Sequence, residues 1–350
     1  MLPLYKAYFE KAGMKEYAPV ILPFNGYFYS GDFLSGFGAG ALYYLKDDKI
    51  VYGFLEDGFY NYLKKMREWY AAGYIYKDFA SRVNDPFFLP NTSLTYGGAA
   101  GVWFGVQSQL GDAMSMPQYN LYFDVRPMPS PVDAANGITE APNHLLPYYY
   151  DDNNRGWAIT AKCANIPKLL SVLDHMYSHE GGMLKVNGLT KEQGADTDPI
   201  YVKAGLTDGA YWFKDGKMVF NPLLAYGGGT LDYASFCDMR LPGLLDRTVY
   251  RQAVDPKMQA ADLQWVKYKN TKRIKKLSTA LSFPLDDEKK LRDNNVAMND
   301  YANSAIPKFI MGTAALDDQA WAKFKETLRN LGAEENIRIQ QAAYERYLRR

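Results

Sequence analysis

The chain has 350 residues, of which 47% are hydrophobic and 23% are charged, and its formal net charge is +1. This length predicts two or three domains, and the near-neutral charge argues against nucleic acid as a partner. No apolar run approaches the roughly 18 residues that a transmembrane helix needs. The opening segment, MLPLYKAYFEKAG, lacks the basic and apolar regions of a signal peptide, so we expect none in this chain.

The sequence of the first half of the chain indicates a mixture of turns, short strands and one amphipathic helix. GFGAG at 36–40 departs from the GxGxxG spacing of a nucleotide-binding loop and predicts a turn. Residues 57–73 predict an amphipathic helix whose apolar side chains recur at helical spacing and which Gly73 ends. A short strand leading into a turn is expected within 94–106, and 120–125 alternates as a strand does. The proline-rich stretch 126–137 predicts a loop.

In the second half, the sequence predicts a strand followed by a helix, which indicates an α/β organisation. Residues 156–162 read as a strand, and a helix then begins at Asn165 and ends at Gly181 and Gly182. Residues 183–260 are rich in loop formers, and the basic stretch 262–276 favours a solvated helix face over a nucleic-acid patch. Two helices are expected at the C-terminus, at 318–331 and 334–347. Asp317 and Asp318 are placed to cap the first of these.

Few residues offer metal or acid–base chemistry. His175 and His179 stand at i, i+4 on the predicted helix, but HExxH is absent and a solvated pair is the favoured interpretation. Cys163 and Cys237 form no CxxC set, so we expect free thiols and no zinc site. Asp151 with Asn153 and Asn154 lacks the spacing of a calcium loop. We therefore expect no cofactor and no metal.

Aromatic residues make up 15% of the chain, most of them among its 29 tyrosines. Several aromatic clusters stand beside polar residues in expected loops, and most other rings are expected to fill cores. Sugars present apolar C–H faces and a rim of hydroxyls, which flat rings and Asp, Asn or Arg side chains can bind. Each cluster alone is weak evidence for a binding site. Several such clusters in a sequence without a catalytic motif favour a binding protein over an enzyme.

Four segments, in order, resemble family 1 extracellular solute-binding proteins of bacterial carbohydrate ABC importers. The helix and turn EDGFYNYLKKMREWYAAGYIYKDFAS occupy 56–81, and GGAAGVWFG occupies 97–105. The third segment, GWAITAKCANIPKLLSVLDHMYSHEGGMLKVNG, occupies 156–188. The fourth, PKFIMGTAALDDQAWAKFKETLRNLGAEENIRIQQAAYERY, occupies 307–347. The long lipoproteins of Gram-positive bacteria look most similar.

The resemblance implies an α/β fold with two lobes, of the periplasmic-binding-protein type II class, whose N-terminal lobe is incomplete in this chain. Residues 1–153 would form the first part of the second, C-terminal-type lobe. Residues 154–260 would form the remaining part of the first lobe, with the crossings between lobes. Residues 261–350 would form helices that pack mainly on the second lobe. A missing lobe portion would leave an apolar surface uncovered.

The same resemblance implies the ligand-binding residues. Trp103 matches a tryptophan that stacks on sugar in related binders, with core packing as the alternative. Gly101 would be the turn that aims Trp103 into the cleft, with Phe104 packed behind it. Cys163 matches a buried, structural cysteine. Further expected ligand contacts come from two other segments, 25–27 and 150–157: Asn25, Tyr27, Tyr150, Asp151, Arg155 and Trp157.

The implied function is the binding of an oligosaccharide by a component of an ABC importer that performs no chemistry. Closure of the lobes would then present the ligand to the permease subunits in the membrane. The resemblance further implies a monomer, on the outer face of the membrane through a lipid anchor or in the periplasm. The alternative is a glycan-active hydrolase or lyase with the same aromatic cleft, which would need two facing carboxylates.

Overall fold

The computed structural model divides the chain into two compact units. The first unit combines Met1–Asn154 with Ala261–Arg350, and the second unit is Arg155–Ala260. Which lobe each unit represents stays a prediction. The structure describes these residues: 1–22, 33–40, 42–81, 92–103, 110–111, 113–114, 124–129, 131–139, 158–224, 243–244, 256–266, 274–278 and 281–349.

A parallel strand pair lies in the first unit. β1 (Ala18–Ile21) pairs with β4 (Ala100–Trp103) in the register that places Val20 opposite Val102 and Ile21 opposite Trp103. The helix α1 (Leu2–Lys11) precedes β1 and contacts it, while α4 (Thr92–Thr95) precedes β4. β4 therefore confirms the short strand expected within 94–106.

A three-stranded antiparallel sheet also belongs to the first unit. β2 (Tyr43–Lys46) lies between β3 (Lys49–Tyr52) and β7 (Ile274–Lys276). Asp47 and Asp48 join β2 to β3 with φ angles of 49° and 60°. Two successive left-handed residues make the tight hairpin turn that matches the twist of paired strands, and Asp tolerates this conformation better than most residues.

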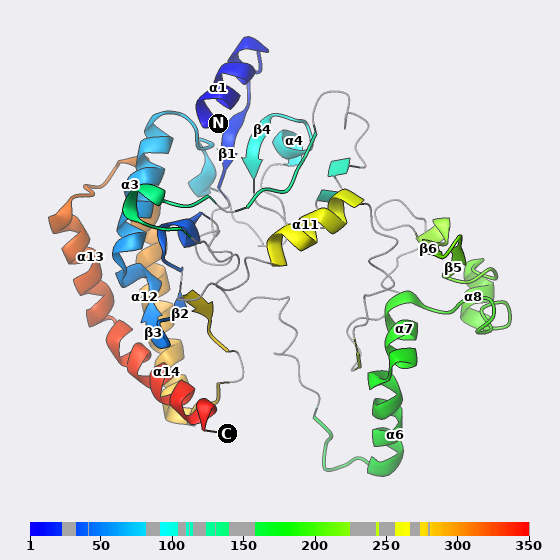
Figure 1. Cartoon of the computed structure of the whole chain (residues 1–350). Coiled ribbons are helices and arrows are strands. Elements are labelled where there is room, and N and C mark those ends of the chain that lie inside the picture. The colour runs from blue at the N-terminus through cyan, green and yellow to red at the C-terminus, as the bar shows by residue number, and fades with distance from the viewer. Residues whose placement is uncertain are drawn as a thin grey trace. The chain divides into compact units, whose positions relative to one another are not determined.

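Four helices cover the rest of the main core. They are α3 (Asp57–Ala71), α12 (Leu285–Met311), α13 (Asp318–Asn330) and α14 (Ala333–Leu348). Figure 1 shows α12, α13 and α14 beside α3 and the β2–β3 hairpin. Their apolar faces bury a cluster that includes Phe54, Phe59, Leu63, Met66, Met298, Ile306, Trp321 and Phe324.

Capping residues in the sequence mark where these helices begin and end. The Asp317 side chain accepts a hydrogen bond from the backbone N–H of Ala320 at 2.8 Å, which confirms it as a cap of α13. Gly73 follows α3 with a φ of 73°, a conformation that glycine adopts without a steric cost. The helices predicted at 57–73, 318–331 and 334–347 are thus confirmed within a residue or two at their ends.

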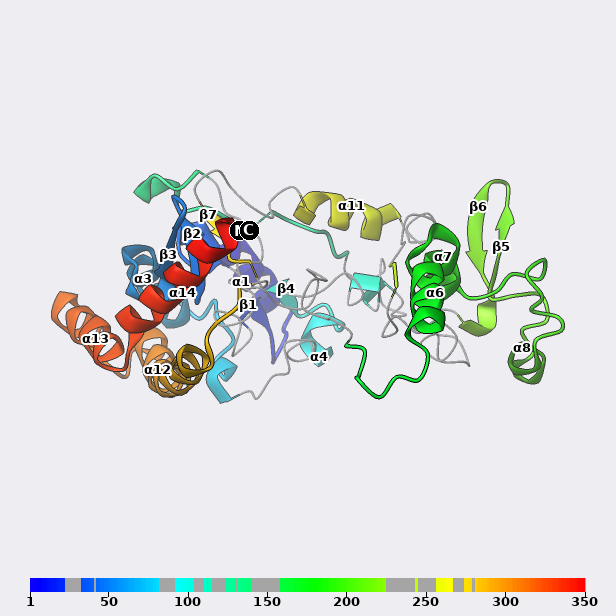
Figure 2. The ribbon, with the colours of Figure 1, turned by 90° about the horizontal axis from the view of Figure 1, so that it is seen from below.

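The second unit has its own small core. It contains α6 (Ile166–Tyr177), α7 (His179–Asn187), α8 (Pro199–Ala204) and the hairpin of β5 (Tyr211–Lys214) with β6 (Lys217–Phe220). Figure 2 shows β5 and β6 running side by side. The buried side chains come from α8, the hairpin and the adjoining loops: Ala195, Tyr201, Leu206, Ala210, Tyr211, Met218 and Leu224.

Short elements complete the described chain. The helix α11 covers Pro256–Val266. Single turns of 3-10 helix cover Leu34–Phe37 (η1), Gly53–Leu55 (η2), Phe79–Ser81 (η3), Ala134–Asn136 (η4) and Pro222–Leu224 (η6). The proline-rich loop expected at 126–137 is confirmed where it is described, apart from η4.

The helix predicted from Asn165 to Gly182 is wrong at its end. Asn165 does begin α6, accepting a hydrogen bond from the N–H of Lys168, but α6 ends at Tyr177. Ser178 has an extended backbone and caps a new helix, α7, by accepting from the N–H of Gly181 at 3.0 Å. Figure 1 shows α6 and α7 as successive helices. His175 and His179 therefore do not share a helix.

Three other predicted elements differ in the structure. Residues 158–162, the described part of the strand expected at 156–162, form irregular chain and a turn. Residues 124–125, the described end of the strand expected at 120–125, belong to no strand either. The basic stretch 262–276 is not one helix, because its end forms β7 and buries Ile274 against Tyr44. Strands form where a neighbouring strand pairs with them, and a local sequence pattern does not record that pairing.

Candidate functional site

Trp103 is the last residue of β4 and is partly buried. Its side chain packs against a small cluster formed by Ala18, Ile21 and Leu94. The next residue back, Val102, packs on the opposite side against the main core. Trp103 therefore contributes to packing and also keeps part of its ring accessible at the carboxyl end of the strand.

Gly101 is not the turn that was expected to aim Trp103. It lies inside β4, and the turn before the strand contains Gly98, whose φ is 75°. A Cβ atom on Gly101 would lie 2.6 Å from Cγ of Tyr5 and 2.7 Å from the carbonyl oxygen of Pro19. Gly101 thus allows α1 and β1 to approach β4 closely, while Phe104 lies outside the described residues.

The other six expected ligand-binding residues lie outside the part of the chain that the structure describes. They are Asn25, Tyr27, Tyr150, Asp151, Arg155 and Trp157. Their roles stay predictions. Cys163 is described and is partly exposed, so the expectation that it is buried is wrong.

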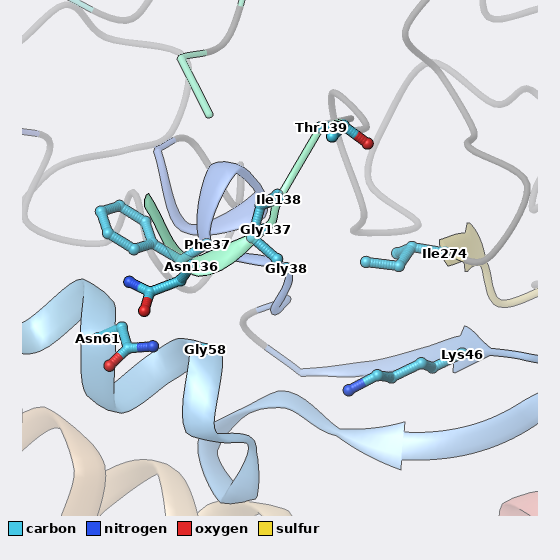
Figure 3. Close-up of a pocket in the computed structure, with 10 residues that line it drawn as sticks. All are labelled: Phe37, Gly38, Lys46, Gly58, Asn61, Asn136, Gly137, Ile138, Thr139 and Ile274. Atoms are coloured by element: carbon cyan, nitrogen blue, oxygen red, sulfur yellow. The ribbon is translucent and has the colours of Figure 1, made fainter. Parts of the chain in front are cut away.

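A pocket of about 320 Å³ opens in the first unit. Figure 3 shows Lys46 reaching from β2 towards Gly38 and Gly58, while Asn61 and Asn136 lie together beside Phe37. The remaining lining residues come from the loop after η4 and from β7: Gly137, Ile138, Thr139 and Ile274. The pocket therefore gathers five separate segments around one space.

Close backbone contact shapes this pocket. A Cβ atom on Gly58 would lie 2.2 Å from the carbonyl oxygen of Phe37, so only glycine lets η1 reach the start of α3. Gly38 ends η1 with a φ of 73°, which confirms that the GFGAG stretch forms a turn. The ring of Phe37 packs edge-on against Tyr62, with ring centres 5.7 Å apart, and is held at the pocket wall.

The pocket presents both polar and apolar groups. The ammonium of Lys46 forms an ion pair with Glu56, and the amide of Asn136 donates to the carboxylate of Asp133. Asn61 and Thr139 add further polar groups, and Phe37 adds an aromatic ring. Such a lining can bind a small polar molecule through hydrogen bonds and one apolar face. Sequence reasoning missed it because no local motif joins these segments.

Shifted pKa values lie elsewhere in the molecule. Burial raises the pKa of Tyr43 and of Tyr52, which belong to the core. At the exposed end of α3, burial and a hydrogen bond to Asp318 raise the pKa of Tyr60. None of these three tyrosines lines the pocket.

The described residues contain no group of three or more His, Cys, Asp or Glu side chains that could hold a metal ion. Asp151, Asn153 and Asn154 lie outside the described ranges. No described helix has both the length and the apolar character needed to cross a bilayer.

Sequence comparison finds no match for the chain, neither among protein-family models nor among curated proteins. Solved structures do match. An HMO-binding, ABC-transporter-associated solute-binding protein from Bifidobacterium longum infantis is 16% identical, with a TM-score of 0.63, over 99% of this chain and 69% of that one. The alginate-binding protein AlgQ2, solved without calcium ion, is 18% identical, with a TM-score of 0.62, over 98% and 66%.

A third match is the ABC-transporter substrate-binding protein FusA of S. pneumoniae in complex with kestose. It is 15% identical, with a TM-score of 0.59, over 99% of this chain and 67% of that chain. This chain thus spans about two thirds of the length of each of these structures. The likeness shows that the chain has the α/β fold of two-domain solute-binding proteins.

Proposed function

We propose that the chain is the carbohydrate-binding component of a bacterial ABC importer, and that its ligand is an oligosaccharide. The observation that carries the proposal is the shared fold over 98–99% of the chain with solute-binding proteins described as binding alginate, HMO or kestose. The chain's many tyrosines and its aromatic–polar clusters are consistent with the same ligand class.

The strand pair supports a place for the sugar. In open α/β sheets, ligands bind outside the carboxyl ends of the parallel strands. β1 and β4 are parallel, and Ile21 and Trp103 stand opposite each other at those ends. Asn25 and Tyr27 follow β1 by four and six residues in the sequence. We propose that Trp103 stacks on a sugar ring, and that Asn25 and Tyr27 contribute from the same edge.

A second group of proposed ligand contacts comes from residues near the boundary between the two units in the sequence. The chain passes from the first unit to the second between Asn154 and Arg155. Tyr150, Asp151, Arg155 and Trp157 flank this boundary in the sequence. In a protein that closes two lobes on its ligand, residues at a crossing between lobes can contact that ligand in the closed state. We propose these four as ligand contacts for that reason.

The proposed partners follow from the proposed role. The closed protein would deliver its ligand to the permease subunits of an importer, and it would act as a monomer. Its proposed location is the outer face of the cell membrane, through a lipid anchor, or the periplasm. The component itself would leave the glycan unchanged.

Isothermal titration calorimetry of the natively produced protein tests the proposal. The panel contains alginate oligomers, fructo-oligosaccharides, milk oligosaccharides and, as a chemically different control, a peptide mixture. Saturable heat with one glycan class and none with the peptides is expected. Binding of peptides alone, or turnover of a chromogenic glycan in the same preparation, contradicts the proposed function. Turnover favours the glycan-active enzyme instead.

A further inference from the structure

The pocket of about 320 Å³ in the first unit is not used by the proposed oligosaccharide contacts. None of its described lining residues is Trp103 or one of the six other residues proposed to bind the sugar. All of the lining belongs to the first unit, so the pocket is a feature of that unit alone. Its volume falls within the range of small-molecule sites, about 300–1,000 Å³, so it is large enough for a ligand of its own.

Contacts between the surrounding segments hold the walls of the pocket in place. The N–H of Asp133 donates to the carbonyl oxygen of Gly36 at 2.8 Å, which joins the loop around η4 to η1. These segments touch so closely that a Cβ atom on Gly36 would lie 2.0 Å from the carbonyl oxygen of Pro131. Lys46 of β2 and Ile274 of β7 are register partners, so they lie on the same face of the sheet. A ligand therefore meets a preformed site, which lowers the cost of ordering it.

Two side-chain amides lie together in the pocket. Figure 3 shows the amide of Asn61, on α3, near that of Asn136, at the end of η4, beside the ring of Phe37. Asn136 donates to Asp133 at 2.5 Å and keeps its amide oxygen as an acceptor. The Asn61 side chain is partly exposed, and its amide has no hydrogen-bond partner within the part of the chain that the structure describes. The pair therefore offers both donors and acceptors to a ligand.

The charges of the pocket favour a neutral ligand. Lys46 is the one ionisable residue of the described lining, and Glu56 already forms an ion pair with its ammonium. An anionic ligand would have to share that ammonium with Glu56. A divalent cation would find no carboxylate in the described lining. A neutral hydroxyl can instead accept a hydrogen bond from the remaining N–H groups of Lys46 without disturbing the ion pair.

Apolar groups form the rest of the lining. Tyr62 packs edge-on against the ring of Phe37 and holds it at the wall. Ile138 and Ile274 add aliphatic surface, and Thr139 adds a hydroxyl. Amides, a hydroxyl and an ammonium beside apolar surface match a compact molecule that carries hydroxyls at its rim and C–H groups on its faces.

We propose that the pocket is a second ligand site, which binds a neutral polyhydroxylated molecule of the size of a monosaccharide or a linear polyol. The amides of Asn61 and Asn136 and the ammonium of Lys46 bind its hydroxyls. Phe37 and Ile138 contact its C–H groups. The site uses other residues than the proposed oligosaccharide contacts, so the proposal does not depend on them.

Amide chemical shifts of the 350-residue chain test the proposal. TROSY spectra of the deuterated protein are recorded during titration with glucose, mannose and sorbitol, and with inorganic phosphate and glycine as charged controls. Saturable shifts of the amides of Gly38, Gly58 and Gly137 are expected with at least one of the neutral probes, because these residues line the pocket. The charged controls should leave those amides unchanged.

A matched pair of variants assigns the binding to the pocket. Asn61→Leu removes the amide and keeps a side chain of similar size, and Asn330→Leu makes the same change at an exposed position on α13. Asn61→Leu should weaken binding at least about fivefold, because hydrogen bonds to the hydroxyls are lost. Asn330→Leu should bind as the parent protein does. The titration of the parent protein uses no variant, so the test stands even if Asn61→Leu fails to fold.

Two results overturn the proposal. One is the absence of pocket shifts with every neutral probe, whether or not a charged control binds. The other is equal affinity of a folded Asn61→Leu variant and the parent protein. Shifts confined to Ala18–Ile21 and Ala100–Trp103 count as the first result, and they would leave the proposed oligosaccharide site intact.

Discussion

The side-chain amide of Asn336 donates a hydrogen bond to the phenolic oxygen of Tyr43 at 3.1 Å, and so joins α14 to β2. The same amide group lies 3.0 Å from Oδ1 of Asn295, to which the Tyr43 hydroxyl also donates at 3.1 Å. Asn336 in turn accepts from Asn294 at 2.9 Å. This buried network fixes the first helix of the C-terminal group and the last against the hairpin.

Asn336→Ala is expected to lower the free energy of unfolding by about 1–3 kcal/mol, because it leaves buried donors and acceptors without partners. The control is Asn330→Ala, which changes an exposed residue at the end of α13 and should alter stability by no more than about 0.5 kcal/mol. Urea unfolding followed by circular dichroism measures both. Equal midpoints for the two variants would show that the network does not contribute to stability.

Tyr52 and Tyr43 provide a second matched pair. They are opposite each other in the β2–β3 register, with ring centres 4.8 Å apart. Among the described residues the buried hydroxyl of Tyr52 has no hydrogen-bond partner, whereas that of Tyr43 belongs to the network. Tyr52→Phe should therefore keep or raise stability, and Tyr43→Phe should lower it by about 1 kcal/mol. The prediction fails if the two losses measured by urea unfolding are the same.

Alkaline pH should destabilise the first unit through these tyrosines. Burial raises the pKa of Tyr43 and Tyr52 in the folded state above the unfolded value of about 10. As pH rises, the unfolded chain therefore releases these protons first. Their contribution is complete below about pH 10 and is lost progressively above it. Unfolding experiments across this range, with tyrosinate absorbance as a second probe, should show ionisation of the buried rings only on unfolding.

Tyr52→Phe also serves as the control for this pH dependence. It removes one of the three buried phenols of the hairpin whose pKa is raised by burial, Tyr43, Tyr44 and Tyr52, without removing the hydrogen-bond network. The slope of stability against pH above about 10 should become shallower in this variant, because fewer protons differ between the two states. An unchanged slope would assign the alkaline loss to other groups.

The C-terminal helices show what the sequence pattern can predict. Trp321, Phe324 and Leu328 recur at helical spacing after the capping residue Asp317, and the structure confirms both the helix and its cap. α12 escaped prediction although it is the longest described helix. Its buried face includes Met298, Ala302 and Pro307, and its sequence is rich in polar residues, so its periodicity is weak.

The sequence did not predict which strands would pair or where a helix would break. A strand is predicted at 156–162, but residues 158–162 have no strand partner among the described residues. Ser178 ends one helix and caps the next, although the pattern on either side suits one continuous helix. Sequence identified Trp103 only through a family resemblance. The pocket at Lys46, Asn61 and Asn136 depends on contacts between distant segments, which no local pattern records.

Gly101→Ala is expected to destabilise the contact between α1 and the β1–β4 pair. The added methyl would lie 2.6 Å from the Tyr5 ring and 2.7 Å from the backbone oxygen of Pro19. Because that oxygen cannot move alone, a loss of about 1–3 kcal/mol is expected, as for overpacking elsewhere. The control is Gly13→Ala, where nothing lies within 4 Å of the new methyl. Its positive φ alone costs about 1–2 kcal/mol, a cost that Gly101 does not carry, so the two variants are distinguished by exchange: Gly101→Ala should speed amide exchange in β1, and Gly13→Ala should not.

Trp103→Ala tests the proposed sugar contact separately from stability. Stacking of an aromatic ring on a ligand contributes through apolar contact, so the variant should lose at least about tenfold in affinity, or about 1.4 kcal/mol. Trp103→Phe keeps a flat ring and should lose less. Tyr347→Ala, which removes an exposed ring at the end of α14, should leave affinity unchanged. Calorimetric titration gives the affinities, and thermal unfolding of the same samples gives the stabilities.

The packing of Trp103 determines how the result is interpreted. Its ring touches the Ala18, Ile21 and Leu94 cluster, so some loss of stability is expected in the alanine variant. Because the side chain is only partly buried, that loss should be smaller than for a fully buried tryptophan, which costs about 3–5 kcal/mol. Unfolding of the Trp103→Ala variant with unchanged affinity in its folded fraction would assign Trp103 to the core. A folded variant that no longer binds would place it in the sugar site.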